Sequence, residues 1–195
     1  MTDTDYLDGQ IIIAMPAMDD PRFERSVIYI CAHSEDGAMG LVLNKPAKNI
    51  DFIELMTRLN LPQGEDSIEF SPRDSDRLVH FGGPVEPGRG FVLHSGEYNS
   101  KENTLSINED VGLTATLNVL KEIAEGKGPK KSLLALGYAG WSPGQLENEI
   151  MHNGWLHCTA DEDLLFGSQL EEKYQHALEK LGIDPALLSG QAGHA

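Results

Sequence analysis

The sequence is poor in cysteine and in basic residues, and it contains no long apolar run. No run approaches the ~20 apolar residues that a membrane-spanning helix needs, so no membrane anchor is expected. The N-terminal region carries Asp3, Asp5 and Asp8 and lacks the basic, apolar and small-residue order of a secretory signal. These absences predict a soluble, cytoplasmic protein.

The two cysteines, Cys31 and Cys158, each lie in an apolar, strand-like segment. One possible pair in a cytoplasmic chain of this size gives little reason to expect a disulfide, so we predict two reduced, buried thiols. There is no C-x-x-C motif, and His152, His157 and Cys158 lack the i, i+4 histidine pair of a helical zinc site. We therefore expect no metal and no other cofactor.

Acidic residues outnumber basic ones 31 to 15, and the net charge is −16. Such a charge repels nucleic-acid phosphates, so direct binding of DNA or RNA is disfavoured. The small basic groups at Lys127, Lys130 and Lys131 and at Arg22 and Arg25 are too short to outweigh this field unless the fold gathers them. A protein partner or a small molecule is the expected binding partner.

The length of 195 residues and the 40% hydrophobic content predict one domain covering residues 1–195. Strands and helices are mixed without strict alternation, which indicates an α+β fold. β-Branched and apolar runs predict strands, the first of them paired as neighbours, at 10–15, 26–32, 40–43, 78–81, 91–94, 104–107, 133–137 and 155–158. Helical spacing predicts four helices, at about 49–61, 113–124, 143–152 and 170–181. Polar connections are expected at 62–77, which we predict to be a mobile loop, and at 161–163. Residues 186–195 are expected to form a loose tail.

The segment from Gly140 to Gln145 matches the G-x-S-x-G pattern of a serine hydrolase. In such a turn the amide of the residue after the serine stabilises the oxyanion, but here that residue is Pro143, which has no N–H. The same residues fit a helix start with Ser142 as N-cap, Pro143 in the first position and Gln145 completing a capping box. We therefore predict a structural role for Ser142.

Gly82 and Gly83 end a predicted strand and would let the backbone approach a small anion, but they lack the lysine and hydroxyl of a phosphate-binding loop. The alternative is a strand connection in which the glycines supply positive φ. His33 and His94 each follow a strand and could line the same cleft, or they could hydrogen-bond nearby backbone.

Aromatic residues bracket the predicted helix start. Tyr138, Trp141 and Trp155 lie close to glycines, an arrangement that is common in ligand clefts and equally in cores. The sequence alone leaves both interpretations open.

Several ordered blocks together resemble the AlgH/YqgE family over nearly the whole chain. The N-terminal blocks are Gly9-Gln10, Ala14-Met15-Pro16, Asp20-Pro21 with Phe23, Ser26-Val27-Ile28-Tyr29, Gly37-Ala38-Met39-Gly40-Leu41 and Asn44-Lys45-Pro46. The later blocks are Gly82-Gly83-Pro84-Val85, Phe91-Val92-Leu93-His94-Ser95, Gly137-Tyr138-Ala139-Gly140-Trp141, Gly144-Gln145-Leu146-Glu147 and Trp155-Leu156.

The resemblance implies a single α+β domain, with a twisted, mixed, barrel-like sheet flanked by about four helices, from a bacterial cytoplasm. Some family members are named as transcriptional regulators, yet the family has no agreed biochemical activity and offers no catalytic residues to transfer. Its motif residues imply one surface cleft for a partner or ligand, here His33, Asn44, Gly82, Gly83, His94, Gly137, Tyr138, Trp141, Gln145 and Glu149.

Two functional hypotheses follow. The first is a regulator that binds a partner or small molecule at this cleft and controls transcription indirectly. The second is a small hydrolase or nucleotide-processing enzyme that uses His33 or His94 as a base and the glycine turns as an anion cradle.

Overall fold

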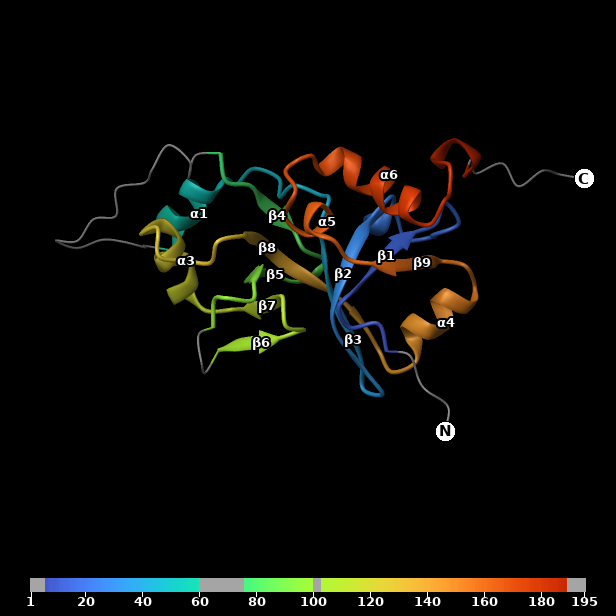
Figure 1. Cartoon of the computed structure of the whole chain (residues 1–195), viewed down its shortest axis with the longest axis horizontal. Coiled ribbons are helices and arrows are strands. Elements are labelled where there is room, and N and C mark those ends of the chain that lie inside the picture. Colours follow the sequence, from blue (N-terminus) through green and yellow to red (C-terminus); the bar gives the residue numbers. More distant parts are fainter. Residues whose placement is uncertain (1–5, 60–75, 100–102, 189–195) are drawn as a thin grey trace, which may run out of the picture.

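A computed structural model describes residues 6–59, 76–99 and 103–188. Its nine strands form one curled sheet, a half-barrel, in the order β6-β7-β5-β8-β3-β2-β1-β9 (Figure 1). Strand β4 lies off this path and pairs in parallel with β8, whereas the other pairs are antiparallel. The strands are β1 (Gln10–Ala14), β2 (Val27–Ser34), β3 (Gly37–Val42), β4 (Val79–Phe81), β5 (Val85–Ser95), β6 (Thr104–Ser106), β7 (Val111–Thr114), β8 (Ser132–Trp141) and β9 (Trp155–Thr159).

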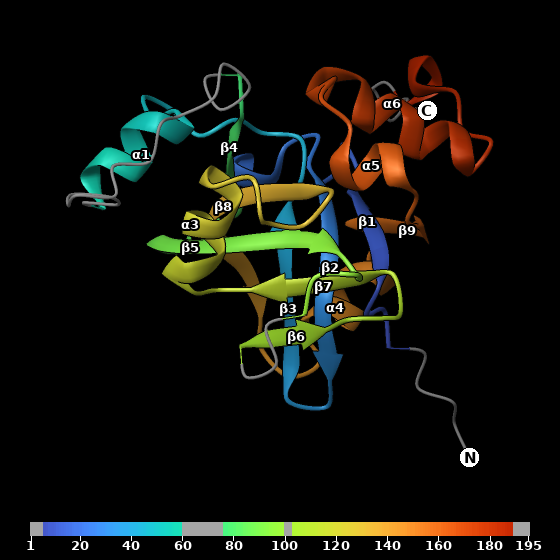
Figure 2. The ribbon, with the colours of Figure 1, turned by 60° about the vertical axis from the view of Figure 1, so that its left-hand side comes forward.

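Five α-helices in the described ranges cover the sheet: α1 (Phe52–Arg58), α3 (Leu117–Ala124), α4 (Gln145–Met151), α5 (Glu162–Phe166) and α6 (Leu170–Lys180). Helices α1 and α3 lie together at one end of the molecule and α4 lies at the other, with α5 and α6 along one side (Figure 1). Strands β5, β7 and β6 run across the direction of β1–β3, which shows how strongly the sheet curls (Figure 2). This is the α+β, barrel-like domain that the sequence predicts.

Both faces of the central strands are buried, which explains why these strands are continuous apolar runs. Ile11 and Ile13 join a cluster that includes residues of α5 and α6, whereas Ile12 and Ala14 join a second cluster with Leu146 of α4. Successive side chains of a strand point to opposite faces, so a strand that is covered on both sides has no polar alternation. A third cluster packs α1 and α3 against β4, β5 and β8.

Most predicted strands are confirmed, and the first three pair as neighbours in antiparallel order. Helix α1 begins after Asp51, whose carboxylate accepts a hydrogen bond from the Glu54 amide. Cys31 and Cys158 are free and buried, as predicted. No helix in the described ranges has the length and apolar character needed to cross a bilayer.

The helix predicted at 113–124 is wrong in its first part. Residues 111–114 form strand β7, which pairs with β5 on one side and β6 on the other. Helix α3 begins only at Leu117, which is 52% exposed, and it buries Leu120 and Ala124 together with Val119 and Ile123. The hydrogen bonds of two neighbouring strands thus override a helical spacing of leucines.

Other boundaries also differ from the predictions. Strand β8 continues past Gly137 to Trp141 because its last residues pair with β3. The predicted loop at 161–163 starts helix α5, with Asp161 as its N-cap. The last helix, predicted at 170–181, ends at Lys180, and Leu181 is its 37% exposed C-cap.

The predicted mobile loop at 62–77 lies outside the described residues except for Asp76 and Arg77. The predicted loose tail at 186–195 overlaps the described residues only at 186–188, where Pro185–Leu187 form a 3-10 turn and Leu188 packs against the core. Residues 189–195 lie outside the described ranges.

Candidate functional site

An open groove of about 580 Å³ lies where β2, β3, β8 and the start of β5 meet. We call it the β8 groove. It is lined by Ala32, Ser34, Asp36, Gly37, Ala38, Met39, Val85, Arg89, Phe91, Tyr138, Gly140, Trp141 and Ser142.

Small residues on adjacent strands make this part of the sheet hollow. Ala32 lies directly opposite Met39, and Met39 lies directly opposite Gly140, so these three residues share one face across β2, β3 and β8. Gly140 is exposed, and a β-carbon there would come no closer than 3.4 Å to the Tyr138 ring. Alanine and glycine therefore leave a floor that larger side chains would fill.

The wall of the groove is aromatic and aliphatic. Val85 lies opposite Tyr138, and the Phe91 ring meets the Tyr138 ring edge to face at 5.8 Å. The Arg89 guanidinium lies over Phe91 at 5.1 Å and forms an ion pair with Glu86 at 3.3 Å. The groove thus combines an apolar interior with one exposed cation at its rim.

An irregular stretch of β5 carries this wall. Between Val85 and Gly90 the pairing with β8 shifts, so residues 86–89 bulge out of the strand. Gly83 and Gly137 let the two backbones approach beneath the bulge, since a β-carbon on Gly137 would lie 2.3 Å from the Gly83 carbonyl oxygen. Both glycines have positive φ, +155° and +71°.

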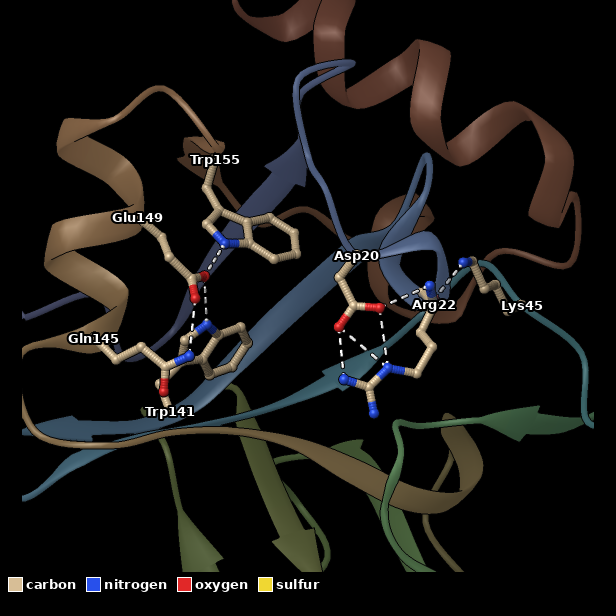
Figure 3. A network of polar contacts seen from close by, with 7 residues as sticks. All are labelled: Asp20, Arg22, Lys45, Trp141, Gln145, Glu149 and Trp155. Atoms are coloured by element: carbon tan, nitrogen blue, oxygen red, sulfur yellow. Dashed lines mark hydrogen bonds and ion pairs between the residues drawn. The ribbon is translucent and has the colours of Figure 1, made fainter.

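A carboxylate behind the groove holds the end of β8 in place (Figure 3). Glu149 Oε2 accepts hydrogen bonds from the indole N–H groups of Trp141, at 3.0 Å, and Trp155, at 2.7 Å. Glu149 Oε1 accepts from Gln145 Nε2 at 2.9 Å, and Gln145 Oε1 accepts from the Ser142 amide at 3.0 Å. Helix α4 therefore positions two residues that line the groove, Trp141 and Ser142.

The loop before β2 closes the other side of the tryptophan pair. Phe23 stacks on Trp141 and meets Trp155 edge to face. Asp20 pairs with Arg22, and Lys45 Nζ donates to the Arg22 carbonyl at 2.8 Å (Figure 3). These contacts fix the loop residues that precede Phe23.

Replacing Glu149 by glutamine is expected to lower the free energy of unfolding by about 1–2 kcal/mol. A neutral carbonyl is a weaker acceptor for two buried indole N–H groups, and the new amide would face the amide of Gln145. Urea unfolding followed by fluorescence measures this directly, because Trp141 and Trp155 are the only tryptophans. Glu171→Gln at the exposed start of α6 is the matched control, because this carboxylate has no side-chain hydrogen bond or ion pair among the described residues. Equal losses in both variants would contradict the proposed role of Glu149.

The predicted cap at Ser142 is wrong. Helix α4 begins at Gln145 with Gly144 as its N-cap, since Gly144 takes φ +75° and leaves Pro143 in the preceding turn. Half of the capping box forms, because the Gln145 side chain accepts from the Ser142 amide, but the Gln145 amide bonds to the Ser142 carbonyl and not to its hydroxyl. Among the described residues, no imidazole is hydrogen-bonded to Ser142.

The two candidate histidines lie apart from the groove and from each other. His33 Nδ1 accepts from the Leu7 amide at 3.0 Å, and its Nε2 contacts Glu147 at 3.0 Å. His94 is fully buried, with Nδ1 bonded to the Ser95 carbonyl and Nε2 to the Thr114 hydroxyl, and burial lowers its pKa. Both rings have all their nitrogens engaged, so the shared His33/His94 cleft is not formed.

The remaining predicted site residues have structural roles. The Asn44 side chain accepts from the Val27 amide and donates to the Arg25 carbonyl, which ties the loop to β2. Gly82 and Gly83 are buried, and the Gly82 amide donates to the Leu136 carbonyl, so it is not free to bind an anion. The predicted single cleft therefore reduces to Tyr138 and Trp141, supported from behind by Gln145 and Glu149.

Sequence reasoning missed the other half of the groove, chiefly Val85, Arg89 and Phe91 of β5. Pro87-Gly88, between Val85 and the apolar run that begins at Phe91, is the signal that indicates a bulge there. The register that places β5 beside β8 has no local signal in the sequence.

Comparison with known proteins agrees with this architecture. Residues 11–186 match the AlgH-like family model. UPF0301 proteins of Rhodopseudomonas palustris and Nitrobacter hamburgensis are 58% and 57% identical to the chain, over 98% and 99% of it and 88% and 89% of their own lengths. The solution structure of the AlgH protein from Pseudomonas aeruginosa is 42% identical, with a TM-score of 0.78 over 100% of this chain and 99% of that one.

A crystal structure of a Corynebacterium diphtheriae protein, 20% identical with a TM-score of 0.69 over 97% of this chain and 94% of that one, shares the fold. The family match extends from β1 to the turn after α6 and so includes every strand of the half-barrel. The chain belongs to the AlgH-like family.

Proposed function

We propose that this protein acts without catalysis, as a regulatory protein that binds an extended segment of a protein partner in the β8 groove. The observation that carries the proposal is the line of Ala32, Met39 and Gly140, an apolar floor that runs across three strands and is open to solvent. Val85 at its edge is 36% exposed, an unusual exposure for a valine in a strand. A large apolar side chain of a partner would cover both.

Any control of transcription would be exercised through that partner in the cytoplasm. The net charge of −16 opposes approach to DNA, and the groove offers a single exposed cation, Arg89, which already pairs with Glu86. The geometry gives no support to a hydrolase, because the two histidines that could act as bases are buried and engaged.

Filling the groove tests this proposal. Gly140→Val is expected to fold normally, since the nearest atoms to a β-carbon belong to the Tyr138 and Val85 side chains at 3.4 Å or more. Phage-displayed linear peptides selected on the wild-type protein should carry at least one large apolar residue. Their affinity for Gly140→Val should fall about tenfold or more, as measured by titration of the synthetic peptides.

The matched control adds the same bulk outside the groove. Ser106→Val lies on the exposed edge strand β6 and should bind the selected peptides as the wild type does. If the selected peptides bind Gly140→Val with unchanged affinity, or if the selection yields no apolar consensus, the β8 groove is not a peptide-binding site.

A further inference from the structure

A second pocket, of about 640 Å³, lies between the two edges of the half-barrel. Its walls come from the start of β1, the end of β9, the turn between β6 and β7, the end of β5 and helix α5. In Figure 2 the turn between β6 and β7 faces β1, with α5 above. We call it the Tyr29 pocket, after the residue at its base.

Tyr29 brings an unsatisfied donor to this pocket. Its side chain is fully buried, and its hydroxyl accepts a long hydrogen bond, 3.4 Å, from Asn108 Nδ2. Within the described ranges no group accepts the hydroxyl proton, and burial raises the pKa of the phenol, so the proton is retained. A buried donor of this kind is stabilised by any ligand oxygen that reaches it.

Gly9 keeps this hydroxyl uncovered. The residue has φ +79°, and a β-carbon there would lie 3.3 Å from Asn108 Nδ2 and 3.8 Å from the Tyr29 oxygen. Gly9, Tyr29 and Asn108 all line the pocket, so the hydroxyl lies at its wall. A side chain at position 9 would occupy the space beside the hydroxyl.

The charged groups around the pocket favour a cation. Lys131 pairs with Glu162, and Asp161 pairs with His176 and Lys180. The Glu97 carboxylate accepts from the Ser95 hydroxyl and the Lys130 amide.

Two carboxylates of the β6–β7 turn, those of Glu109 and Asp110, have no ion-pair partner among the described residues. They lie beside Asn108, whose side chain reaches Tyr29. The lining carries five carboxylates, those of Glu97, Glu109, Asp110, Asp161 and Glu162, against the two ammonium groups of Lys130 and Lys131. A positive ligand would therefore be attracted and a negative one repelled.

Apolar side chains also line the pocket. They are Leu165 and Phe166 of α5 and Val111 of β7, and all three belong to or pack against the main core cluster. The pocket therefore offers, side by side, an apolar surface, a hydroxyl donor and two free carboxylates, the combination that suits a small polar molecule with one apolar face.

We propose that the Tyr29 pocket binds a small organic amine that also carries oxygen acceptors, such as an amino sugar or an amino alcohol. The ammonium lies against Asp110 and Glu109, and a ligand oxygen accepts the Tyr29 hydroxyl proton. This site is independent of the β8 groove, so binding of an amine here neither requires nor excludes a protein partner there.

Four sugars that share one pyranose ring separate the contributions of charge. Glucosamine is the amine probe, N-acetylglucosamine and glucose are its neutral counterparts, and glucuronate is its anion. Binding is followed by backbone amide chemical shifts at a pH of about 6.5, where such an amine is protonated. Glucosamine should shift the resonances of Gly9, Asn108 and Asp110. The neutral sugars should bind with about tenfold lower affinity, and glucuronate should cause no shift.

Two variants test the assigned contacts. Asp110→Asn and Tyr29→Phe should each lower the affinity for glucosamine about five- to tenfold. Gly140→Val, which fills only the β8 groove, should leave the glucosamine affinity unchanged, so a failure of the groove proposal remains distinguishable from a failure of this one. Unfolding in urea, measured alongside, shows whether each variant keeps its fold.

Three results would overturn the proposal. Glucuronate could bind as tightly as glucosamine, glucosamine could bind Tyr29→Phe and Asp110→Asn with wild-type affinity, or no sugar could shift these resonances up to about 20 mM, well above the millimolar Kd of a weak ligand. Each of these results would show that the Tyr29 pocket is not a binding site for such an amine.

Discussion

Replacing Gly83 by alanine is expected to cause the largest loss of stability of any single methyl group added to this fold. The new β-carbon would lie 2.0 Å from the Tyr138 carbonyl carbon and 2.3 Å from the Ala139 amide nitrogen. These are backbone atoms of β8, so no side-chain rotation relieves the overlap. Because Gly83 also has φ +155°, we expect the free energy of unfolding to fall by at least about 4 kcal/mol.

Gly88→Ala is the control in the same stretch of chain. A β-carbon at Gly88 meets no atom within 4 Å, so its effect should stay within about 0.5 kcal/mol. Soluble yield and urea unfolding, followed by tryptophan fluorescence, compare the two variants with the wild type. Equal midpoints for Gly83→Ala and Gly88→Ala would show that β5 and β8 do not approach as closely as described.

This close approach explains how backbone geometry creates the candidate site. Gly83 and Gly137 let β5 cross near β8, and the bulge that follows turns Val85 and Arg89 toward the groove. The glycines act on binding only through the positions of these side chains. Gly83, which the sequence suggested as part of an anion-binding turn, thus helps to position the β5 wall of the β8 groove.

The fold could be predicted from the sequence wherever local chemistry decides the structure. Runs such as Ile11–Ala14 and Val27–Ile30 are too rich in β-branched residues for another assignment, and Asp51 marks a helix start by its side-chain acceptor. The prediction failed at Leu113 and Thr114, where a helical spacing of leucines begins inside a strand that pairs with two neighbouring strands. Only the long-range partners decide such a segment.

The site was less predictable than the fold, for the same reason. Aromatic residues beside glycines indicated Tyr138 and Trp141, and both line the β8 groove. His33 and His94 were predicted to line the cleft and do not line the groove. An imidazole at a strand end takes a structural role when a distant residue, such as Leu7 or Thr114, supplies its hydrogen-bond partner. Nothing within a few residues of His33 or His94 reports those partners.

A buried lysine on α6 is the clearest case of a charge held at a cost to stability. Lys173 is 3% exposed, and its Nζ donates to the Leu43 carbonyl at 3.3 Å. Burial lowers the pKa of Lys173 to about 8. The neighbouring His80 is also buried, and burial, with the Lys173 charge, lowers its pKa to about 4, so it stays neutral near pH 7 and does not compensate the lysine.

Lys173→Met is therefore expected to stabilise the protein by about 2 kcal/mol at pH 7. Methionine fills the same space without a charge to desolvate, while the Leu43 carbonyl loses one donor. Lys180→Met on the same helix is the opposite case, because Lys180 donates hydrogen bonds to the Thr159 carbonyl and to Asp161. This variant should lower the free energy of unfolding by about 1 kcal/mol. A destabilised Lys173→Met at pH 7 would mean that the buried amine has a partner that offsets its burial.

The advantage of Lys173→Met should disappear as the pH rises. In the wild type the folded lysine releases its proton near pH 8 and the unfolded one near pH 10.5, so between these values the unfolded chain binds more protons and stability rises with pH. At about 1.4 kcal/mol per pH unit, the wild type recovers about 3 kcal/mol relative to the variant. Buried groups such as Cys31, whose pKa is raised to about 12, destabilise both proteins at alkaline pH. Only the difference between their urea unfolding energies at pH 7 and pH 10 reports Lys173, and a difference that stays constant would show that this lysine keeps its ordinary pKa in the fold.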